Sequence, residues 1–243
     1  MGSSRFKGKA LSNLQGKAML YRLLERIRFS KNIKKIILAT TNKKEDDVLE
    51  YFCSKNNITC YRGSSEDVLK RIKEAAVKNN LSKIVEILGD NPLVHSDLID
   101  ACISKYNDGN CDYVATATRE YPHLTKNNYL FPIGVRVQVF NIETLLKCDK
   151  LSKEKKYREH STMFITENPK IFHMKFVEAK NKFSSLNRPE LTFAVNYKEN
   201  LQLMNEIFLK NYDINKNFNI NEAIKTFDKN INLSKLMFPT MNN

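Results

Sequence analysis

The first half of the chain alternates between two kinds of apolar pattern. A short run rich in isoleucine at 34–40 is typical of a buried parallel strand, and the run at 84–88 ends at a glycine. Residues 19–27 instead carry Met, Leu and Ile at helical spacing. Further helices are expected at 46–53, 68–76 and 96–106, and further strands at 58–61 and 113–116. Strands that alternate with helices indicate a parallel sheet covered on both faces, so an α/β fold is expected.

The second half is less regular. Valines at 135, 137 and 139 alternate with Arg136 and Gln138, which predicts a half-exposed strand. Residues 191–195 predict another strand, followed by a helix. The Asn- and Lys-rich residues 213–243 retain a helical signal, so we expect them to form a C-terminal helical extension of a domain over 1–212.

Composition places the chain among ordinary globular proteins. Of its 243 residues, 42% are hydrophobic and 28% are charged, which argues against disorder. No stretch approaches the roughly 20 apolar residues of a membrane helix, and the first residues include no apolar export signal. The five cysteines are irregularly spaced without a C-x-x-C pair, which suits reduced thiols and predicts a cytoplasmic location.

The formal net charge of +13 suits an anionic partner, which would be a nucleotide, a nucleic acid or a membrane surface. The lysines are scattered, however. No run of five or six basic residues occurs, and no basic motif is interleaved with aromatic residues. We therefore expect neither nucleic acid nor a membrane as a partner.

Two short motifs point to phosphate chemistry. The opening segment Gly2-Ser3-Ser4-Arg5-Phe6-Lys7-Gly8-Lys9 combines small residues with cations, as in loops that wrap a triphosphate. A disordered basic N-terminus has a similar composition. Asp90 follows the strand at 84–88 directly, where open α/β sheets place ligand chemistry, and its carboxylate suits Mg²⁺. A plain Asp-Asn-Pro turn is the alternative interpretation.

Taken together and in order, several segments resemble the cytidylyltransferase family of acidic-sugar activators. The resemblance is greatest to the branch named for spore coat polysaccharide biosynthesis protein F, related to the 3-deoxy-manno-octulosonate and acylneuraminate cytidylyltransferases. The resembling segments cover most of the chain: GSSRFKGKAL (2–11), GKAMLYRLLERI (16–27), IILATT (36–41), YRGSSEDVLKR (61–71), GDNPL (89–93), REHST (158–162) and NYKENL (196–201).

The resemblance implies a nucleotide-diphospho-sugar transferase fold, a mainly parallel sheet between helices. It also implies a reaction in which a sugar hydroxyl attacks the α-phosphate of CTP with Mg²⁺ as cofactor and pyrophosphate as the leaving group. The partners are then CTP and a sugar, an acidic one in this branch, and the family often forms homodimers. Another nucleotide or a neutral sugar in the same fold, or a nucleotide-binding protein without turnover, are the alternatives.

The resemblance also implies roles for individual residues. The catalytic residues would be Arg5, Lys9 and Asp90. The nucleotide would contact Gly2, Ser3, Ser4, Arg5, Lys9, Arg62 and Ser64. The substrate-binding set would be Arg136, Gln138, Arg158 and His160, although an exposed strand arginine and a structural histidine are alternatives for Arg136 and His160. Asp90 and Asn196 would face the metal, and Asn196 would also cap the following helix together with Glu199.

Four departures from the family pattern stand out. The family has a leading strand that ends in Ala-Arg just before the phosphate loop, whereas this sequence begins inside the loop, so the first strand is expected to be missing. The loop has lost a proline at Lys7. Asn196 stands where a second metal carboxylate is expected. Arg136 and Gln138 replace two acidic residues, which bears on the identity of the acceptor sugar.

Overall fold

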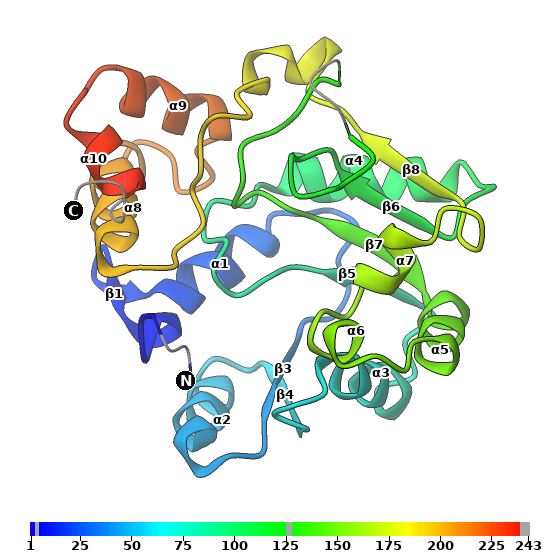
Figure 1. Ribbon diagram of the computed structural model, residues 1–243. Helices are drawn as coiled ribbons and strands as arrows, with labels where there is room; N and C mark the ends of the chain where they lie inside the picture. The colour runs from blue at the N-terminus through cyan, green and yellow to red at the C-terminus, as the bar shows by residue number, and fades with distance from the viewer. Residues whose placement is uncertain (3–4, 125–127, 239–243) are drawn as a thin grey trace.

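The computed structural model describes residues 1–2, 5–124 and 128–238 (Figure 1). Ser3 and Ser4 of the predicted phosphate loop lie outside the described residues. The strands are β1 (Asn13–Leu14), β2 (Lys17–Ala18), β3 (Ile37–Thr41), β4 (Thr59–Gly63), β5 (Lys83–Glu86), β6 (Tyr113–Thr116), β7 (Gln138–Asn141) and β8 (Met174–Val177).

The α-helices are α1 (Met19–Ile27), α2 (Asp47–Lys55), α3 (Val68–Lys78), α4 (Ser96–Asn107), α5 (Ile142–Leu151), α6 (Lys155–Glu159), α7 (Met163–Glu167), α8 (Lys198–Asn211), α9 (Ile220–Asp228) and α10 (Leu233–Met237). Short 3-10 helices are η1 (Lys9–Leu11), η2 (Lys44–Asp46) and η3 (Asn181–Leu186). The helices and strands predicted in the first half all form, and their ends agree with the prediction to within a few residues.

The strands form three groups. β1 and β2 make an antiparallel hairpin, and β3 pairs with β4 in parallel. The third group has the order β5-β7-β6-β8, in which β7 runs antiparallel to both neighbours and β6 runs parallel to β8. The α/β architecture expected from the sequence is confirmed, with β7 as an antiparallel member of the sheet.

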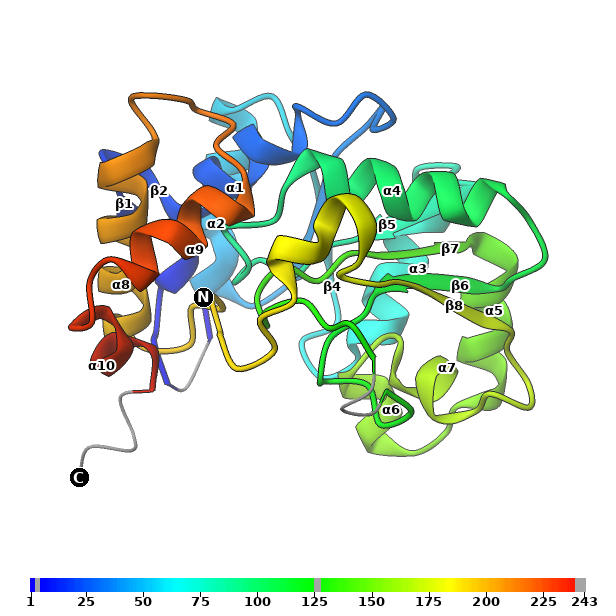
Figure 2. The ribbon, with the colours of Figure 1, turned by 90° about the horizontal axis from the view of Figure 1, so that it is seen from above.

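Helices cover both faces of the sheets, as Figure 2 shows with α4 on one side of the strands and α6 and α7 on the other. One hydrophobic core joins the apolar faces of α1, α4 and α8 to the sheet. A second core joins α3 and α5 to the opposite face. The helical spacing of apolar residues in α1 and α3 directs their side chains into these two cores.

Two expectations for the second half are wrong. The strand around β7 is not half-exposed, because Gln138 is only 1% exposed and the neighbouring valines are fully buried. Residues 191–195 do not form a strand, since only Thr192 makes a bridge, to Ile133. In both places the partners come from distant parts of the chain, which the local pattern does not reveal.

The C-terminal helices share a core with the rest of the chain. Side chains of α9 and α10, among them Ile224 and Leu233, belong to the same core as Met19 of α1. Arg188 binds both carboxylate oxygens of Asp228 on α9, at 2.8 and 3.1 Å. Figure 1 shows α8, α9 and α10 grouped together beside β1. The division of the chain at residue 212 remains a prediction.

Candidate active site

The carboxyl ends of β3 and β5 border a hollow of about 1020 Å³, here called the central slot. Met1, Gly2 and Lys9 line its rim together with Asp46, which follows β3, and Asp90, which follows β5. Carboxyl ends of strands are where open α/β sheets bind ligands. The structure therefore brings the opening segment and both acidic residues to the edge of the sheet where chemistry is expected.

Lys9 holds Asp90 directly. The Lys9 Nζ donates hydrogen bonds to Asp90 Oδ2 at 2.9 Å and to the carbonyl of Val195 at 2.7 Å. The Val195 amide in turn donates to the Asp90 carbonyl at 2.9 Å. The opening segment, the end of β5 and the segment before α8 thus meet at one point.

Arg5 and Asn196 form a second contact at this edge. The exposed Arg5 guanidinium donates through Nη2 to Asn196 Oδ1 at 3.1 Å. Its central carbon lies 5.6 Å from the centre of the Tyr197 ring, which is within cation–π range. The four residues predicted for the phosphates and the metal, Arg5, Lys9, Asp90 and Asn196, therefore come together from three distant segments.

The capping role expected for Asn196 is wrong. The N-cap of α8 is Tyr197, and the reciprocal side chain is Asn200. The Asn200 Oδ1 accepts from the backbone amides of Asn196 and Tyr197, at 3.1 and 3.0 Å. Because Asn200 satisfies these amides, the side chain of Asn196 is left to face Arg5.

Asp46 lines the central slot and was not predicted from the sequence. Its carboxylate accepts from the Met1 amino group, from Thr40 Oγ1 at 2.7 Å and from the Thr41 amide at 3.1 Å. Burial disfavours the charged carboxylate, but hydrogen bonds from the amino group, Thr41 and Thr40 outweigh burial and hold the pKa of Asp46 well below its usual range. The sequence did offer one indication of Asp46, because this aspartate follows β3 by a few residues, as Asp90 follows β5.

Arg62 and Ser64 lie at the carboxyl end of β4, one strand further out. Arg62 forms ion pairs with Asp47 at 2.6 Å and Glu50 at 2.9 Å, and its Nε donates to the Thr41 carbonyl. The Ser64 hydroxyl accepts from the amide of Asp67, which opens α3. Both side chains join β4 to neighbouring elements, and their contact with a nucleotide remains a prediction.

Gln138 belongs to a buried polar network on the sheet. Its Oε1 accepts from Tyr113 Oη at 2.5 Å and from Thr162 Oγ1 at 2.7 Å, and its Nε2 donates to Glu86 Oε2 at 3.3 Å. The other carboxylate oxygen of Glu86 accepts from Ser161 at 2.5 Å. Since these bonds engage both ends of the amide, Gln138 joins three strands to the segment before α7.

Arg136 lies near this network and is only partly engaged by hydrogen bonds. It bonds Glu120 through Nη1 at 3.3 Å, and its Nε is buried without a hydrogen-bond partner among the described residues. Arg158 is fully engaged, with ion pairs at 2.8 Å to Asp67 and Asp149. His160 is exposed at the end of α6. These residues of the predicted substrate set do not form one contiguous contact with Asp90.

Comparison with known proteins identifies the family. A profile described as cytidylyltransferase matches residues 1–232. The chain belongs to the cytidylyltransferase family. This cytidylyltransferase is 36% identical over 229 residues to the uncharacterized protein MJ1063 of Methanocaldococcus jannaschii, covering 94% of this chain and 87% of the relative. It is 29% identical over 215 residues to spore coat polysaccharide biosynthesis protein SpsF of Bacillus subtilis, covering 86% and 83%.

Solved structures agree with the fold of this cytidylyltransferase. A cytidylyltransferase from Leptospira borgpetersenii superposes with a TM-score of 0.83 at 25% identity, covering 96% of this chain and 92% of that one. A CMP:2-keto-3-deoxy-manno-octonic acid synthetase complexed with CTP gives a TM-score of 0.54 at 14% identity, covering 73% and 85%. The predicted nucleotide-diphospho-sugar transferase fold is confirmed.

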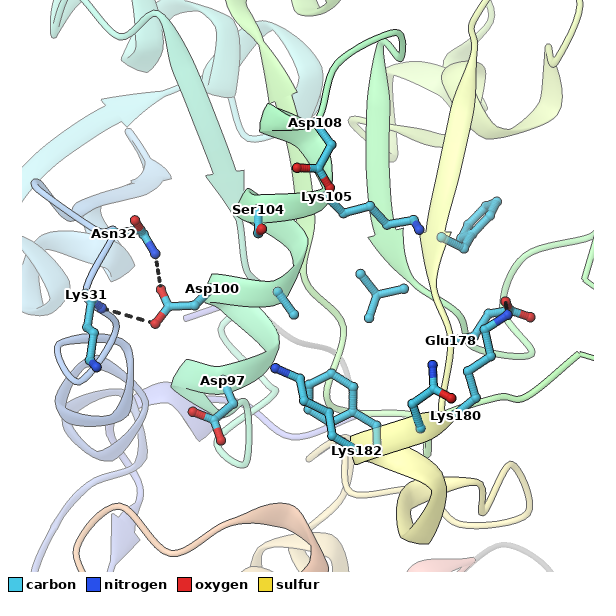
Figure 3. Close-up of a pocket in the computed structure, with 15 residues that line it drawn as sticks. Lys31, Asn32, Asp97, Asp100, Ser104, Lys105, Asp108, Glu178, Lys180 and Lys182 are labelled. Carbon is cyan, nitrogen blue, oxygen red and sulfur yellow. Dashed lines mark hydrogen bonds and ion pairs between the residues drawn. The ribbon is translucent and has the colours of Figure 1, made fainter.

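A second hollow of about 790 Å³ lies away from this site, between α4, β8 and η3 (Figure 3). Lysines 105, 180 and 182 line it together with acidic residues of α4, and the close-up shows Asp100 pointing to Asn32. Of the residues predicted for the active site, those that the structure describes do not line this hollow.

In the described part of the chain, no helix is both long and apolar enough to cross a lipid bilayer.

Proposed function

We propose that this cytidylyltransferase transfers CMP from CTP to a hydroxyl group of a sugar in glycan biosynthesis and releases pyrophosphate. The observation that carries the proposal is the meeting of Arg5, Lys9, Asp90 and Asn196 at the carboxyl edge of the sheet. Two cations from one small-residue loop suit a triphosphate, because charge-assisted hydrogen bonds to phosphate oxygens are among the strongest in proteins.

The reaction needs little covalent chemistry from the protein. The sugar hydroxyl oxygen forms a bond to the α-phosphorus of CTP, the bond from that phosphorus to the bridging oxygen breaks, and the hydroxyl proton is lost to solvent. Arg5 and Lys9 hold the triphosphate in line with the acceptor and stabilise the charge that develops on the leaving pyrophosphate. Their contribution is positioning and electrostatics.

We propose Mg²⁺ as the cofactor, held by Asp90 with Asn196 beside it. The described residues contain no group of three or more His, Cys, Asp or Glu side chains that could hold a metal. One carboxylate and one amide oxygen fit Mg²⁺, which usually binds one or two protein carboxylates, waters and substrate phosphates. When bound, the metal neutralises phosphate charge. Asp90 is 25% exposed at the slot rim and thus accessible to a shared ion.

An acidic sugar is the acceptor that we favour. Relatives over about half of the chain include 3-deoxy-manno-octulosonate cytidylyltransferases, such as that of Syntrophotalea carbinolica at 28% identity over 135 residues. The Arg136 side chain is 20% exposed and pairs with Glu120 through Nη1, and arginine recognises carboxylates in a two-point geometry, so we propose this guanidinium as the group that meets a substrate carboxylate. The acceptor would thus approach from the β7 side.

The test is pyrophosphate release from CTP with Mg²⁺ and a panel of sugar acids, with neutral sugars and the other nucleoside triphosphates in parallel. We expect turnover with CTP and a sugar acid. The Asp90→Asn variant should bring turnover to background, while Asp97→Asn, an exposed acid on α4, should leave turnover unchanged. Turnover with a neutral sugar alone would overturn the acidic acceptor, and no turnover with any pair would overturn the proposed activity.

A further inference from the structure

The segment that joins α5 to α7 is held by Arg158, here called its outer anchor. The Arg158 Nη2 lies 2.8 Å from Asp67 Oδ2 and 2.8 Å from Asp149 Oδ1, and its Nε donates to Asp67 Oδ2 at 2.9 Å. Its Nη1 donates to the carbonyls of Asp149 and Ser152, both at 3.4 Å. The side chain is only 18% exposed, so these charge-assisted bonds are stronger than those of a surface ion pair. Arg158 thus ties α6 to both α3 and α5.

Ser161 and Thr162 form an inner anchor a few residues further on. The Ser161 hydroxyl donates to Glu86 at 2.5 Å, and the Thr162 hydroxyl donates to Gln138 at 2.7 Å. All four side chains are buried. Glu86 ends β5 and Gln138 begins β7, and these two residues are paired across the strands. The inner anchor therefore lies at the edge of the sheet that also carries Asp90, which follows β5.

Only Glu159 and His160 lie between the two anchors, and both are exposed. They follow α6, which packs against α3 and α7 (Figure 1). His160 is one of the residues that the sequence predicts for the substrate. A turn that the protein itself holds at both ends need not be ordered by the substrate, so less binding free energy is lost when the sugar arrives. The two anchors thus preorganise the turn 159–162.

The loop after β4 does not depend on Arg158 for its conformation. The Asp67 Oδ1 caps α3, and the Asp67 amide donates to the Ser64 hydroxyl at 3.0 Å. Arg62 keeps its own ion pairs with α2. Loss of Arg158 should therefore leave the predicted nucleotide contacts Arg62 and Ser64 in place.

We propose that Arg158 is a positioning residue of the acceptor site, which fixes the turn 159–162 at the carboxyl edge of the sheet and does not touch the sugar itself. This inference rests on the proposed function, in which the acceptor approaches from the β7 side, where Gln138 lies. All three guanidinium nitrogens of Arg158 have partners within the protein. Arg158 therefore acts through the turn that it holds.

The kinetic test compares Arg158→Met with Lys73→Met. Lys73 on α3 pairs with the same carboxylate, Asp149, also at 2.8 Å, and is 25% exposed, but it does not hold α6. Because a displacement of about 1 Å can cost a hundredfold in rate, we expect Arg158→Met to lower kcat/KM for the acceptor on the order of a hundredfold. The Kd for CTP should stay unchanged, since Arg5 and Lys9 are untouched.

Lys73→Met should leave both quantities at the wild-type value. Arg158→Lys keeps the charge but not the planar fork that reaches two carboxylates, so its kcat/KM for the acceptor should fall between those of the wild type and Arg158→Met. Equal acceptor kcat/KM in Arg158→Met and Lys73→Met would overturn the proposal. A loss of CTP affinity as large as the loss toward the acceptor would also overturn it.

Amide hydrogen exchange examines the turn without any substrate, so failure here is distinct from failure of the proposed activity. The Met163 amide donates to the His160 carbonyl at 3.0 Å, and the Thr166 amide donates to the Thr162 carbonyl at 3.1 Å. In Arg158→Met we expect both amides to exchange on the order of tenfold faster, and in Lys73→Met at the wild-type rate. Unchanged exchange in Arg158→Met would overturn the proposal.

Thr162→Val provides a second route if Arg158→Met does not fold. Valine keeps the shape of threonine but removes the hydroxyl that bonds Gln138. With Arg158 intact, this variant should show the same faster exchange at Met163 and the same selective loss of kcat/KM for the acceptor. Wild-type exchange together with wild-type acceptor kinetics in Thr162→Val would overturn the proposal.

Discussion

Arg5 makes few contacts that the fold depends on. It is exposed and bonds only the side chain of Asn196 and the Tyr197 ring among the contacts described above. Lys9 differs, because it is half-buried and holds both Asp90 and the Val195 carbonyl. The sequence predicts the same phosphate-binding role for both cations. The structure shows that Lys9 also joins two other segments of the chain, whereas Arg5 is exposed.

For Arg5→Ala we therefore expect weaker CTP binding with unchanged stability. A charge-assisted hydrogen bond is worth about 1.5–3 kcal/mol, which corresponds to roughly a tenfold to hundredfold rise in Kd. Calorimetric titration with CTP measures the Kd, and urea denaturation measures the free energy of unfolding. Lys7→Ala removes the same charge from the same exposed loop and serves as the control. Equal CTP affinity in both variants contradicts the assignment of Arg5.

Asn196→Asp tests the metal role that the sequence suggested for this position. Stability should change little, because the amides before α8 are bonded by the side chain of Asn200 and not by that of Asn196. An added carboxylate near the metal should lower the Mg²⁺ concentration for half-maximal activity by about tenfold, the size of effects close to metal ligands. A Mg²⁺ titration of pyrophosphate release measures this, with Asn196→Ala as the comparison. Superimposable titrations of wild type and Asn196→Asp would place position 196 outside the metal site.

Among the elements, the segment 191–195 is the one that positions Asn196. The Ile133 amide donates to the Leu191 carbonyl at 3.0 Å, and the Ile133 carbonyl accepts from the Phe193 amide at 2.7 Å. Two residues further on, the Val195 amide donates to the Asp90 carbonyl. The close approach depends on Gly134, which has φ of 92°. A Cβ on Gly134 would lie 2.3 Å from the Ala194 nitrogen and 2.5 Å from the Phe193 carbonyl carbon.

Gly134→Ala should therefore destabilise the protein strongly. Positive φ costs an alanine about 1–2 kcal/mol, and backbone displacement adds to that, so we expect a loss of about 3 kcal/mol or more in the free energy of unfolding. Gly109→Ala is the matched control, because Gly109 has φ of 85° but an added Cβ would meet nothing within 4 Å. Urea denaturation of both variants measures the difference. If both variants lose the same free energy of unfolding, the close contact with Ala194 does not contribute to the loss.

The periodicity of the sequence correctly predicted the helices in which apolar residues recur at every turn and face the hydrophobic core. Helices α1 and α3 are examples, because every turn repeats the same burial. The pattern failed at β7, where Gln138 looks exposed beside the valines but is buried by hydrogen bonds with Glu86, Tyr113 and Thr162. It also failed for Asn196, since two asparagines four residues apart offer the same local signal and only the fold selects Asn200. The order of the family motifs along the whole chain predicted Arg5, Lys9, Asp90 and Asn196 as site residues, and the structure places these four residues close together.

At the scale of the whole molecule, the buried carboxyl group of Glu86 makes stability depend on pH. Burial raises the pKa of Glu86 above its usual value, although Ser161 and the nearby Arg136 and Arg71 oppose this. A carboxyl whose pKa is raised in the folded state takes up protons more readily there than in the unfolded chain. Its contribution to stability is thus complete below the unfolded pKa and is lost as pH rises through the folded pKa.

Relative to Glu86→Gln, the wild-type protein should therefore lose free energy of unfolding as pH rises from about 4 toward 7. Glutamine keeps a polar group of the same shape but does not titrate. Urea denaturation of both proteins across this range gives the difference directly. Parallel curves for the two proteins would mean that the Glu86 pKa is the same in the folded and unfolded states.

The contacts of the two loop cations also bear on which anions the site accepts. Within the protein, Lys9 has Asp90 as an acceptor and Arg5 has Asn196. An anion that binds these cations must form hydrogen bonds with them that are stronger than the hydrogen bonds to Asp90 and Asn196 that it replaces. A single orthophosphate or sulfate ion can compensate for one exchange, whereas a chain of three phosphates can compensate for both at once. If Arg5 and Lys9 bind the triphosphate as we propose, these internal contacts would favour nucleoside triphosphates over the smaller anions that are abundant in a cell.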